Sequence, residues 1–258
     1  MAKIILMDMD GTITPARKSM TPLMASKLAR VQSAGFELGI VSGSDMDYIK
    51  QQCGILFDVS PADWKKIHYF PCNGTKYYTA KNNKFHLEYA YDMKKTLGKS
   101  MYMRLIREIV DKHSNLFWLE DGDKIPMSGT FIKYRGSMVN WCPIGRDSDP
   151  EDRKTWVQLD NKNQWRKHIL DSFRNCDTWK DITFKLGGET SFDIYPNGWD
   201  KTLSLKQFEN YEKVYFIGDS CTPTGNDYEA YISAGDYGFE TDSPATTIEI
   251  LEKIMATQ

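Results

Sequence analysis

The sequence predicts an α/β fold: a doubly wound parallel sheet of the Rossmann type, with a smaller α+β unit inserted into it. The first observation is a pair of short apolar runs, residues 4–7 and 38–41, which are typical of buried parallel strands. The second is a helix signal between these runs, and the third is another apolar run at residues 214–217. Strands that alternate with helices at both ends of the chain indicate a doubly wound sheet.

Two helix starts can be recognised within this pattern. Thr21 can cap a helix and Pro22 suits the first helical position, after which apolar residues recur at the spacing of one helix face. Ser243 and Pro244 give a similar signal for a last helix. Each helix follows or precedes an apolar run, as the predicted fold requires.

The middle of the chain has a different pattern. Helical spacing occurs at residues 102–109 and 165–173, and strand patterns joined by Gly-containing turns occur at 130–135, 138–141, 182–186 and 190–194. Hairpins accompanied by helices predict an α+β unit. We expect this unit to span residues 82–186, and the core domain to consist of residues 1–81 and 187–258.

The composition excludes some classes of function. The chain has 258 residues, 41% of them hydrophobic, and a net charge of -2, which argues against bulk attraction to nucleic acid or to an anionic membrane. The five cysteines form no Cys-x-x-Cys pair, so neither a zinc site nor a disulfide framework is expected. The first apolar run is too short for a signal peptide or a membrane span. We therefore expect a cytoplasmic protein with no nucleic-acid or membrane partner.

The strongest chemical signal is the pair Asp8 and Asp10, followed by Gly11 and Thr12, directly after the first predicted strand. Ligands of open α/β sheets bind at this edge. One aspartate can attack phosphorus to form an aspartyl-phosphate, and the other can protonate the leaving oxygen. Isolated Asp-x-Asp pairs are usually helix caps or solvated turns. Here the position after a strand favours catalysis.

A second acidic motif follows the run at residues 214–217. Asp219 and Asp227 would add negative charge at the same edge as Asp8, and such charge needs a cation. Mg²⁺ binds carboxylates and phosphate oxygens together. Gly, Asn and Asp are also ordinary turn residues, so this motif indicates a metal site only in combination with the Asp8–Asp10 motif.

Two weaker signals fit the same site. Ser42 and Ser44 can hold a phosphate through hydroxyl and backbone N–H groups, although Ser44 could simply cap a helix. Lys201 could neutralise the phosphate and the aspartates, although a lone lysine is usually a solvated surface charge.

Together and in this order, these motifs resemble the haloacid dehalogenase superfamily, whose members carry an inserted cap domain. Several further stretches are similar to the eukaryotic-type phosphomannomutases: residues 10–17, 129–140, 143–146, 151–153 and 187–201. The similarity extends through nearly the whole chain. One departure is Ser220, which stands where that family usually has a lysine.

The resemblance implies a role for each candidate residue. Asp8 would be the nucleophile and Asp10 the general acid and base, assisted by Lys201, Ser42 and Ser44. Magnesium would be held by Asp8, the Asp10 backbone carbonyl, Asp219 and Asp227. The substrate would be bound by Arg17, Arg135, Arg146, Arg153, Ser191 and Asp193. Surface ion pairs are the commoner role of arginines such as those in the charge-rich loop 146–153.

The implied reaction interconverts mannose 6-phosphate and mannose 1-phosphate through an aspartyl-phosphate, with a hexose 1,6-bisphosphate as activator. The resemblance also implies a homodimer through the cap and a place in GDP-mannose biosynthesis. One alternative is a magnesium-dependent hexose-phosphate phosphatase with water as the acceptor, against which the cap arginines argue. Another alternative is a catalytically silent binding protein. The intact aspartates and Lys201 argue against this alternative. The sequence does not decide between mannose and glucose.

Overall fold

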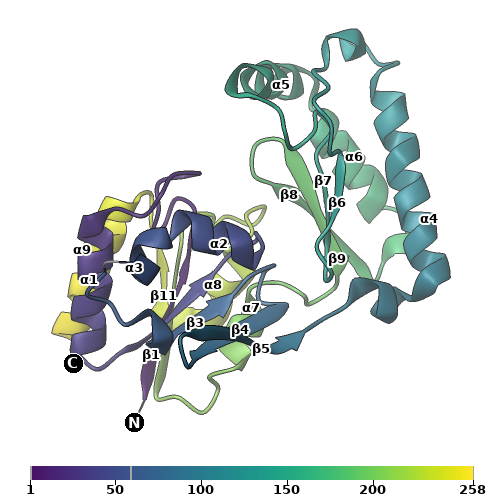
Figure 1. Ribbon diagram of the computed structural model, residues 1–258. Coiled ribbons are helices and arrows are strands. Elements are labelled where there is room, and N and C mark those ends of the chain that lie inside the picture. Colours follow the sequence, from purple (N-terminus) through teal and green to yellow (C-terminus); the bar gives the residue numbers. More distant parts are fainter. Residues whose placement is uncertain (1, 59, 258) are drawn as a thin grey trace. The chain divides into compact units, whose positions relative to one another are not determined.

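The computed structural model describes residues 2–58 and 60–257 (Figure 1). The chain forms two compact units. The first unit consists of Met1–Ala90 and Gly198–Gln258, and the second consists of Tyr91–Asn197. The second unit is therefore an insertion into the first.

The first unit is built on a mixed sheet. Among the described residues this sheet has seven strands, in the order β11-β10-β1-β2-β3-β4-β5. The first five of these run parallel, and β4 and β5 are antiparallel to their neighbours. The strands are β1 (Lys3–Asp8), β2 (Glu37–Val41), β3 (Ile67–Phe70), β4 (Lys76–Lys81), β5 (Lys84–Ala90), β10 (Lys213–Gly218) and β11 (Gly238–Glu240).

Helices cover both faces of this sheet (Figure 1). They are α1 (Pro22–Ser33), α2 (Met46–Gln52), α3 (Gly54–Asp58), α7 (Thr202–Lys206), α8 (Tyr228–Ala234) and α9 (Pro244–Ala256). Ile5 and Met7 of β1 share a core with residues of α1, α2, α3 and α9. Ile4 and Leu6 share a second core with residues of α7 and α8. Because successive side chains of a strand point to opposite faces, β1 is buried on both sides, and the prediction of a doubly wound sheet is confirmed.

The helix starts expected from the sequence are also confirmed. The Thr21 side chain accepts a hydrogen bond from the backbone N–H of Met24 at 3.2 Å at the start of α1. The Ser243 side chain accepts one from the backbone N–H of Thr246 at 3.3 Å at the start of α9. Both helices have proline in the first turn, where its missing N–H costs nothing.

The second unit is built on an antiparallel sheet, which has four strands among the described residues, in the order β6-β7-β9-β8. The elements are β6 (Ile132–Tyr134), β7 (Val139–Trp141), β8 (Ile182–Gly187), β9 (Ser191–Pro196), α4 (Met93–Leu116), α5 (Pro150–Asn163) and α6 (Trp165–Arg174). One face is apolar: Trp141 stacks on Phe192 at 4.6 Å between ring centroids, and Phe184 stacks on Phe173 of α6 at 4.2 Å. Alternation then places Asn140 and Asp193, which pair across β7 and β9, on the opposite face.

The boundaries between the units differ from the expected ones. The hairpin of β4 and β5 continues the sheet of the first unit by pairing with β3, so the first boundary lies after residue 90 and not after residue 81. Strand β9 pairs with β7 and β8, so the second boundary lies after residue 197 and not after residue 186. Ser191 and Asp193 consequently belong to the second unit.

Short 3-10 helices at Trp64–Lys66, Gly122–Lys124, Asp177–Trp179 and Gly235–Tyr237 complete the described elements. No helix among the described residues has both the length and the hydrophobicity that crossing a bilayer requires.

Candidate active site

The candidate site lies at the edge of the first sheet where the parallel strands end. β1 lies between β2 and β10, and the register pairs Asp8 with Val41 and Met7 with Ile217. The residues that follow β2 and β10 therefore lie beside Asp8 at one edge. The chain leaves β1 toward β2 and returns to its other side at β10, which is the switch point where such sheets bind ligands.

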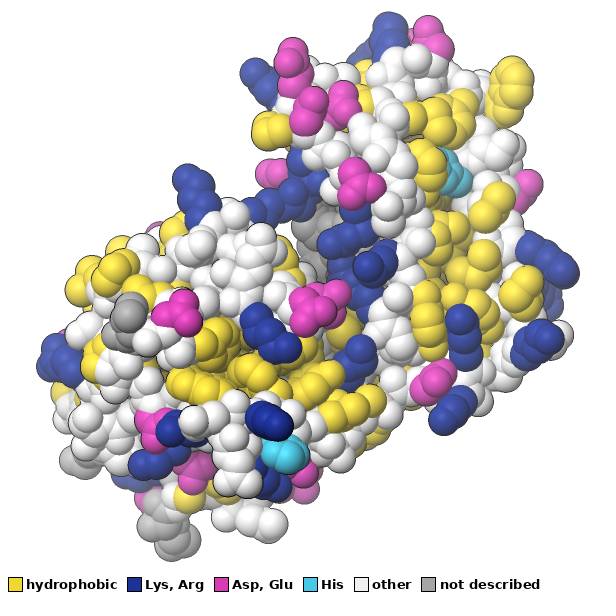
Figure 2. Space-filling view, viewed as in Figure 1, with side chains coloured by type: hydrophobic (Ala, Val, Ile, Leu, Met, Phe, Trp, Pro, Cys, Tyr) yellow, Lys and Arg dark blue, Asp and Glu magenta, His cyan; other side chains and the backbone are white. Residues whose placement is uncertain are grey.

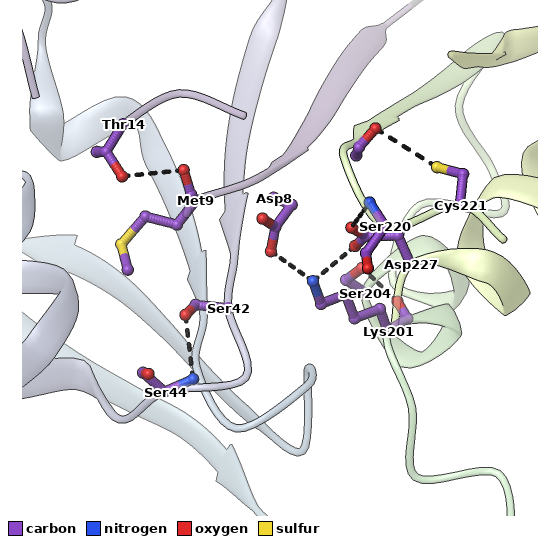
Figure 3. Close-up of polar contacts among 11 residues, drawn as sticks. Asp8, Met9, Thr14, Ser42, Ser44, Lys201, Ser204, Ser220, Cys221 and Asp227 are labelled. Carbon is purple, nitrogen blue, oxygen red and sulfur yellow. Dashed lines mark hydrogen bonds and ion pairs between the residues drawn. The ribbon is translucent and has the colours of Figure 1, made fainter. Parts of the chain in front are cut away.

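Lys201 joins the acidic residues of this edge. It is fully buried and donates hydrogen bonds to Asp8 and, at 2.6 Å, to Asp227. The three side chains point toward one another from the end of β1, the start of α7 and the start of α8 (Figure 3). The second oxygen of Asp227 accepts a hydrogen bond from the backbone N–H of Ser220 at 3.0 Å, which holds the loop after β10 against the site.

Glycine allows a close approach between the two acidic motifs. Gly11 has a φ of +85°, and a Cβ there would overlap the carboxylate of Asp219. The tight turn after Asp10 and the end of β10 therefore touch. This contact explains why a glycine follows the Asp8–Asp10 pair.

The charges of the cluster are incompletely balanced. Among the described residues, carboxylate oxygens of Asp8, Asp219 and Asp227 all lie within 4.8 Å of one another. Burial raises the pKa of Asp8 well above its usual value. The charge of Lys201 lowers this pKa, and the charges of Asp227 and Asp219 offset part of that lowering. Although Asp219 is exposed, desolvation by the surrounding protein raises its pKa to about 6, and the charge of Asp227 adds to the rise.

Lys201 itself remains charged. Burial lowers its pKa, but the charges of Asp227 and Asp8 outweigh burial, so the pKa is raised overall. A single ammonium cannot offset the charge of the neighbouring carboxylates. The donor set fits a divalent cation that prefers oxygen ligands, because such an ion would restore the ionised form of Asp8 and Asp219.

Asp10 does not contribute its carboxylate to this cluster among the described residues. Its Oδ1 accepts hydrogen bonds from the backbone N–H of Arg17 at 2.9 Å and from the Tyr48 hydroxyl at 3.2 Å. The side chain of Asp10 is thus fixed beside the site, apart from the ligand set. Its predicted role as a metal ligand through the backbone carbonyl stays a prediction.

Ser42 and Ser44 follow β2 at the same edge. Ser42 is buried, and its Oγ accepts a hydrogen bond from the backbone N–H of Ser44 at 3.1 Å. Asp45 caps α2, by accepting a hydrogen bond from the backbone N–H of Tyr48 at 3.1 Å. The simple capping role considered for Ser44 is therefore wrong.

Apart from Arg17, which lies in the first unit, the remaining candidate residues lie in the second unit, on or next to the polar face of its sheet. Arg146 donates to Asn140 Oδ1 at 2.7 Å, and Asn140 Nδ2 donates to Asp193 Oδ1 at 2.8 Å. Lys185 is buried and pairs in register with Asp193 on the next strand. Figure 2 shows Lys and Arg side chains gathered over this part of the second unit.

The other substrate-binding candidates surround this network. Arg153 of α5 donates to Thr190 Oγ1 at 2.8 Å, and the Ser191 hydroxyl donates to the Gly187 carbonyl at 2.6 Å across the β8–β9 hairpin. Arg135, directly after β6, is 9% exposed. Arg153 is half-buried and Arg146 is exposed. Guanidinium groups gathered at one polar face are suited to binding anions.

Comparison with known proteins now identifies the family. Residues 24–257 match the family model described as eukaryotic phosphomannomutase. The chain belongs to the eukaryotic phosphomannomutase family. The phosphomannomutase of Dendrobium officinale is 34% identical over 246 residues, which cover 95% of this chain and 91% of the relative. That of Encephalitozoon cuniculi is 33% identical, with 98% and 93% covered.

Solved structures show the same fold at much lower sequence identity. An N-terminally truncated IMP-nucleotidase from Plasmodium falciparum aligns with a TM-score of 0.61 and 13% identity, covering all of this chain and 71% of that one. The C-terminal domain of Candida albicans trehalose-6-phosphate phosphatase aligns with a TM-score of 0.60 and 12% identity, covering 99% and 92%. Together with the family, these likenesses confirm the haloacid dehalogenase type of fold. They carry no information about the substrate.

Sequence reasoning missed several residues that the structure places among the candidate residues. Asn140 and Lys185 were not candidates, although both share the polar face with Asp193. Tyr48 was also missed, because the sequence shows only a tyrosine near the start of a helix. Asn140 is the one polar residue of the apolar stretch 138–141, which could have indicated it. Its hydrogen bond to Asp193 could not be predicted, because it depends on the register of β7 and β9.

Proposed function

We propose that this chain is a phosphomannomutase that interconverts mannose 6-phosphate and mannose 1-phosphate, with Asp8 as the nucleophile. The observation that carries the proposal is the buried Asp8 carboxylate, which Lys201 contacts at the ligand-binding edge of the sheet. The family match supports the reaction, but it begins at residue 24. The role of Asp8 therefore rests on the geometry of the site.

The reaction needs one carboxylate to attack and another to exchange a proton. An Asp8 oxygen attacks the phosphorus of a hexose 1,6-bisphosphate, and the bond between phosphorus and the sugar oxygen breaks. Asp10 gives its proton to that oxygen as it leaves. In the second half, the free hydroxyl of a hexose monophosphate gives its proton to Asp10 and attacks phosphorylated Asp8, which regenerates the Asp8 carboxylate and forms a hexose 1,6-bisphosphate. This bisphosphate turns end for end and donates its other phosphate to Asp8, so that the phosphate has changed position on the sugar.

Magnesium is part of the proposal. Asp8, Asp219, Asp227 and the Asp10 backbone carbonyl would hold it, because carboxylate and carbonyl oxygens are its preferred protein ligands. When bound, it would offset the negative charge of the cluster and of the transferring phosphate. Ser42 and Ser44 would bind that phosphate by hydroxyl and backbone N–H groups, and Lys201 would remain between Asp8 and Asp227.

The second unit would act as the cap that binds the rest of the substrate. Arg135, Arg146 and Arg153 would bind the phosphate that is not reacting, since guanidinium groups make bidentate contacts with phosphate. Ser191 and Asp193 would bind sugar hydroxyls. Arg17 of the first unit would add a further cationic contact, and the cap would exclude water from the aspartyl-phosphate.

The proposal also includes a cytoplasmic location and the supply of mannose 1-phosphate for GDP-mannose, as the family implies. Cell fractionation with an antibody to the chain tests the location. Recovery in a membrane or organelle fraction would contradict it.

A coupled assay tests the reaction. With mannose 1-phosphate and a hexose 1,6-bisphosphate, we expect mannose 6-phosphate as the main product, measured beside a parallel reaction with glucose 1-phosphate. Asp8→Asn should lower turnover by at least about a thousandfold, because the neutral amide cannot replace the carboxylate as the nucleophile. Asp236→Asn, a change at an exposed aspartate, is the matched control and should leave turnover unchanged.

Each result of this assay has a defined meaning. Free phosphate as the main product would identify a phosphatase and contradict the mutase. Near-normal turnover by Asp8→Asn would contradict the nucleophile. Absence of any reaction in the presence of Mg²⁺ would point to a catalytically silent binding protein.

Metal binding can be measured without turnover. Isothermal titration calorimetry should detect Mg²⁺ binding to the wild-type chain, and Asp219→Asn should weaken it at least about tenfold because a ligand carboxylate is lost. Asp236→Asn again serves as the control. Equal affinity of wild type and Asp219→Asn would show that the acidic cluster is not the site.

The oligomeric state can be tested on exposed apolar residues of the second unit. Met103 and Val110 are exposed and lie two turns apart on one face of α4, and Trp118, just beyond that helix, is 85% exposed. Grouped exposed apolar side chains mark interaction surfaces, so we expect a homodimer through this unit. In sedimentation velocity, Val110→Glu should shift the dimer to monomer, whereas Ile232→Glu in the first unit should not. A monomeric wild-type chain would contradict the proposal.

A further inference from the structure

Tyr48 reaches Asp10 from a different part of the chain. It lies in the first turn of α2, where its backbone N–H is bonded to the Asp45 cap at 3.1 Å. Its ring packs against the main core of the first unit. Both ends of the residue are therefore held, and its hydroxyl donates to Asp10 Oδ1 at 3.2 Å.

A second donor binds the same oxygen. The backbone N–H of Arg17 donates to Asp10 Oδ1 at 2.9 Å. This N–H belongs to the turn that follows Asp10, in which Gly11 N–H donates to the Thr14 carbonyl at 2.8 Å. One donor thus comes from the turn itself, and the other comes from the helix after β2.

Two donors on one oxygen decide where a proton can reside on the carboxyl group. An oxygen that accepts two hydrogen bonds has its lone pairs engaged, so a proton is better accommodated on the other oxygen. Asp10 should therefore carry its exchangeable proton on Oδ2. The orientation of the group about its Cβ–Cγ bond is fixed by the same pair of bonds.

We propose that Tyr48 is a positioning residue that fixes Asp10 with Oδ2 as the oxygen that gives and takes the sugar proton. The inference rests on the proposed function, in which Asp10 is the general acid and base. Tyr48 touches neither the phosphorus nor the sugar in this account. It acts through Asp10, by holding the carboxyl group in the orientation for proton transfer.

The leaving group of the phosphoryl donor separates this role from a general structural one. When a sugar bisphosphate phosphorylates Asp8, the leaving sugar oxygen must receive a proton. When acetyl phosphate does so, acetate leaves as a stable anion and needs no proton. Correct orientation of Asp10 therefore matters for the first donor and not for the second.

The experiment compares single-turnover phosphorylation of Asp8 by a hexose 1,6-bisphosphate and by acetyl phosphate. With Tyr48→Phe, we expect the rate with the bisphosphate to fall about tenfold or more, while the rate with acetyl phosphate stays within about twofold. In an Asp10→Asn background, Tyr48→Phe should have no further effect on either rate, because the group that it positions is gone.

Tyr211→Phe is the matched control. It removes another tyrosine–carboxylate hydrogen bond of the first unit, that of the Tyr211 hydroxyl to Glu37 Oε2 at 2.9 Å. Glu37 begins β2, whereas the candidate site lies where the parallel strands end. This variant should leave both rates unchanged, and thermal unfolding of both variants verifies that they are folded.

Several outcomes would overturn the inference. Equal losses with both donors would mean that Tyr48 only maintains the structure of the site. No loss with the bisphosphate would mean that the hydrogen bond to Asp10 is without consequence. A wild-type chain that accepts phosphate from neither donor would overturn the proposed function, and this inference with it.

Discussion

The buried ammonium of Lys201, held between Asp8 and Asp227, is the interaction on which the candidate site depends. Removing the ammonium would leave the buried carboxylates of Asp8 and Asp227 without their cationic partner, a change that typically costs about 3–5 kcal/mol. The pairing is also incomplete, because Asp219 adds a further carboxylate to the same cluster. Burial and mutual repulsion raise the pKa values of Asp8 and Asp219 as a result. A divalent cation is the natural complement of such a cluster, and with it Asp8 would be ionised and able to attack phosphorus.

The two units supply opposite charges from different kinds of sheet. In the first unit, the acidic groups and Lys201 come from chain segments that meet where parallel strands end, so the sheet itself brings them together. In the second unit, basic and polar side chains share or adjoin one face of an antiparallel sheet whose other face is filled by aromatic rings. The first arrangement suits a metal ion and a reacting phosphate. The second suits a phosphate that is bound without reacting.

The sequence predicted the parts of the site that follow from strand position. Asp8 and Asp219 each follow an apolar run, and parallel strands end at a common edge, so their proximity could be expected. The burial of Lys201 could not be predicted from the sequence, since its partner Asp8 is 193 residues away in the chain. Tyr48 gave no signal because its contact with Asp10 depends on how α2 packs. The first unit boundary was misplaced because the partly exposed strands β4 and β5 lack the apolar pattern of the other core strands. The second was misplaced because the pairing of β9 with β7 and β8 is a long-range contact.

Identification of the phosphorylated residue tests the central claim most directly. The chain would be mixed with a hexose 1,6-bisphosphate labelled in its phosphates, quenched in acid within milliseconds, reduced with borohydride and digested for mass spectrometry. The account predicts that the label is bound as an acyl phosphate, and that reduction converts Asp8 to homoserine. Label on a serine or histidine, or sugar phosphate exchange with no labelled protein at any time, would contradict it.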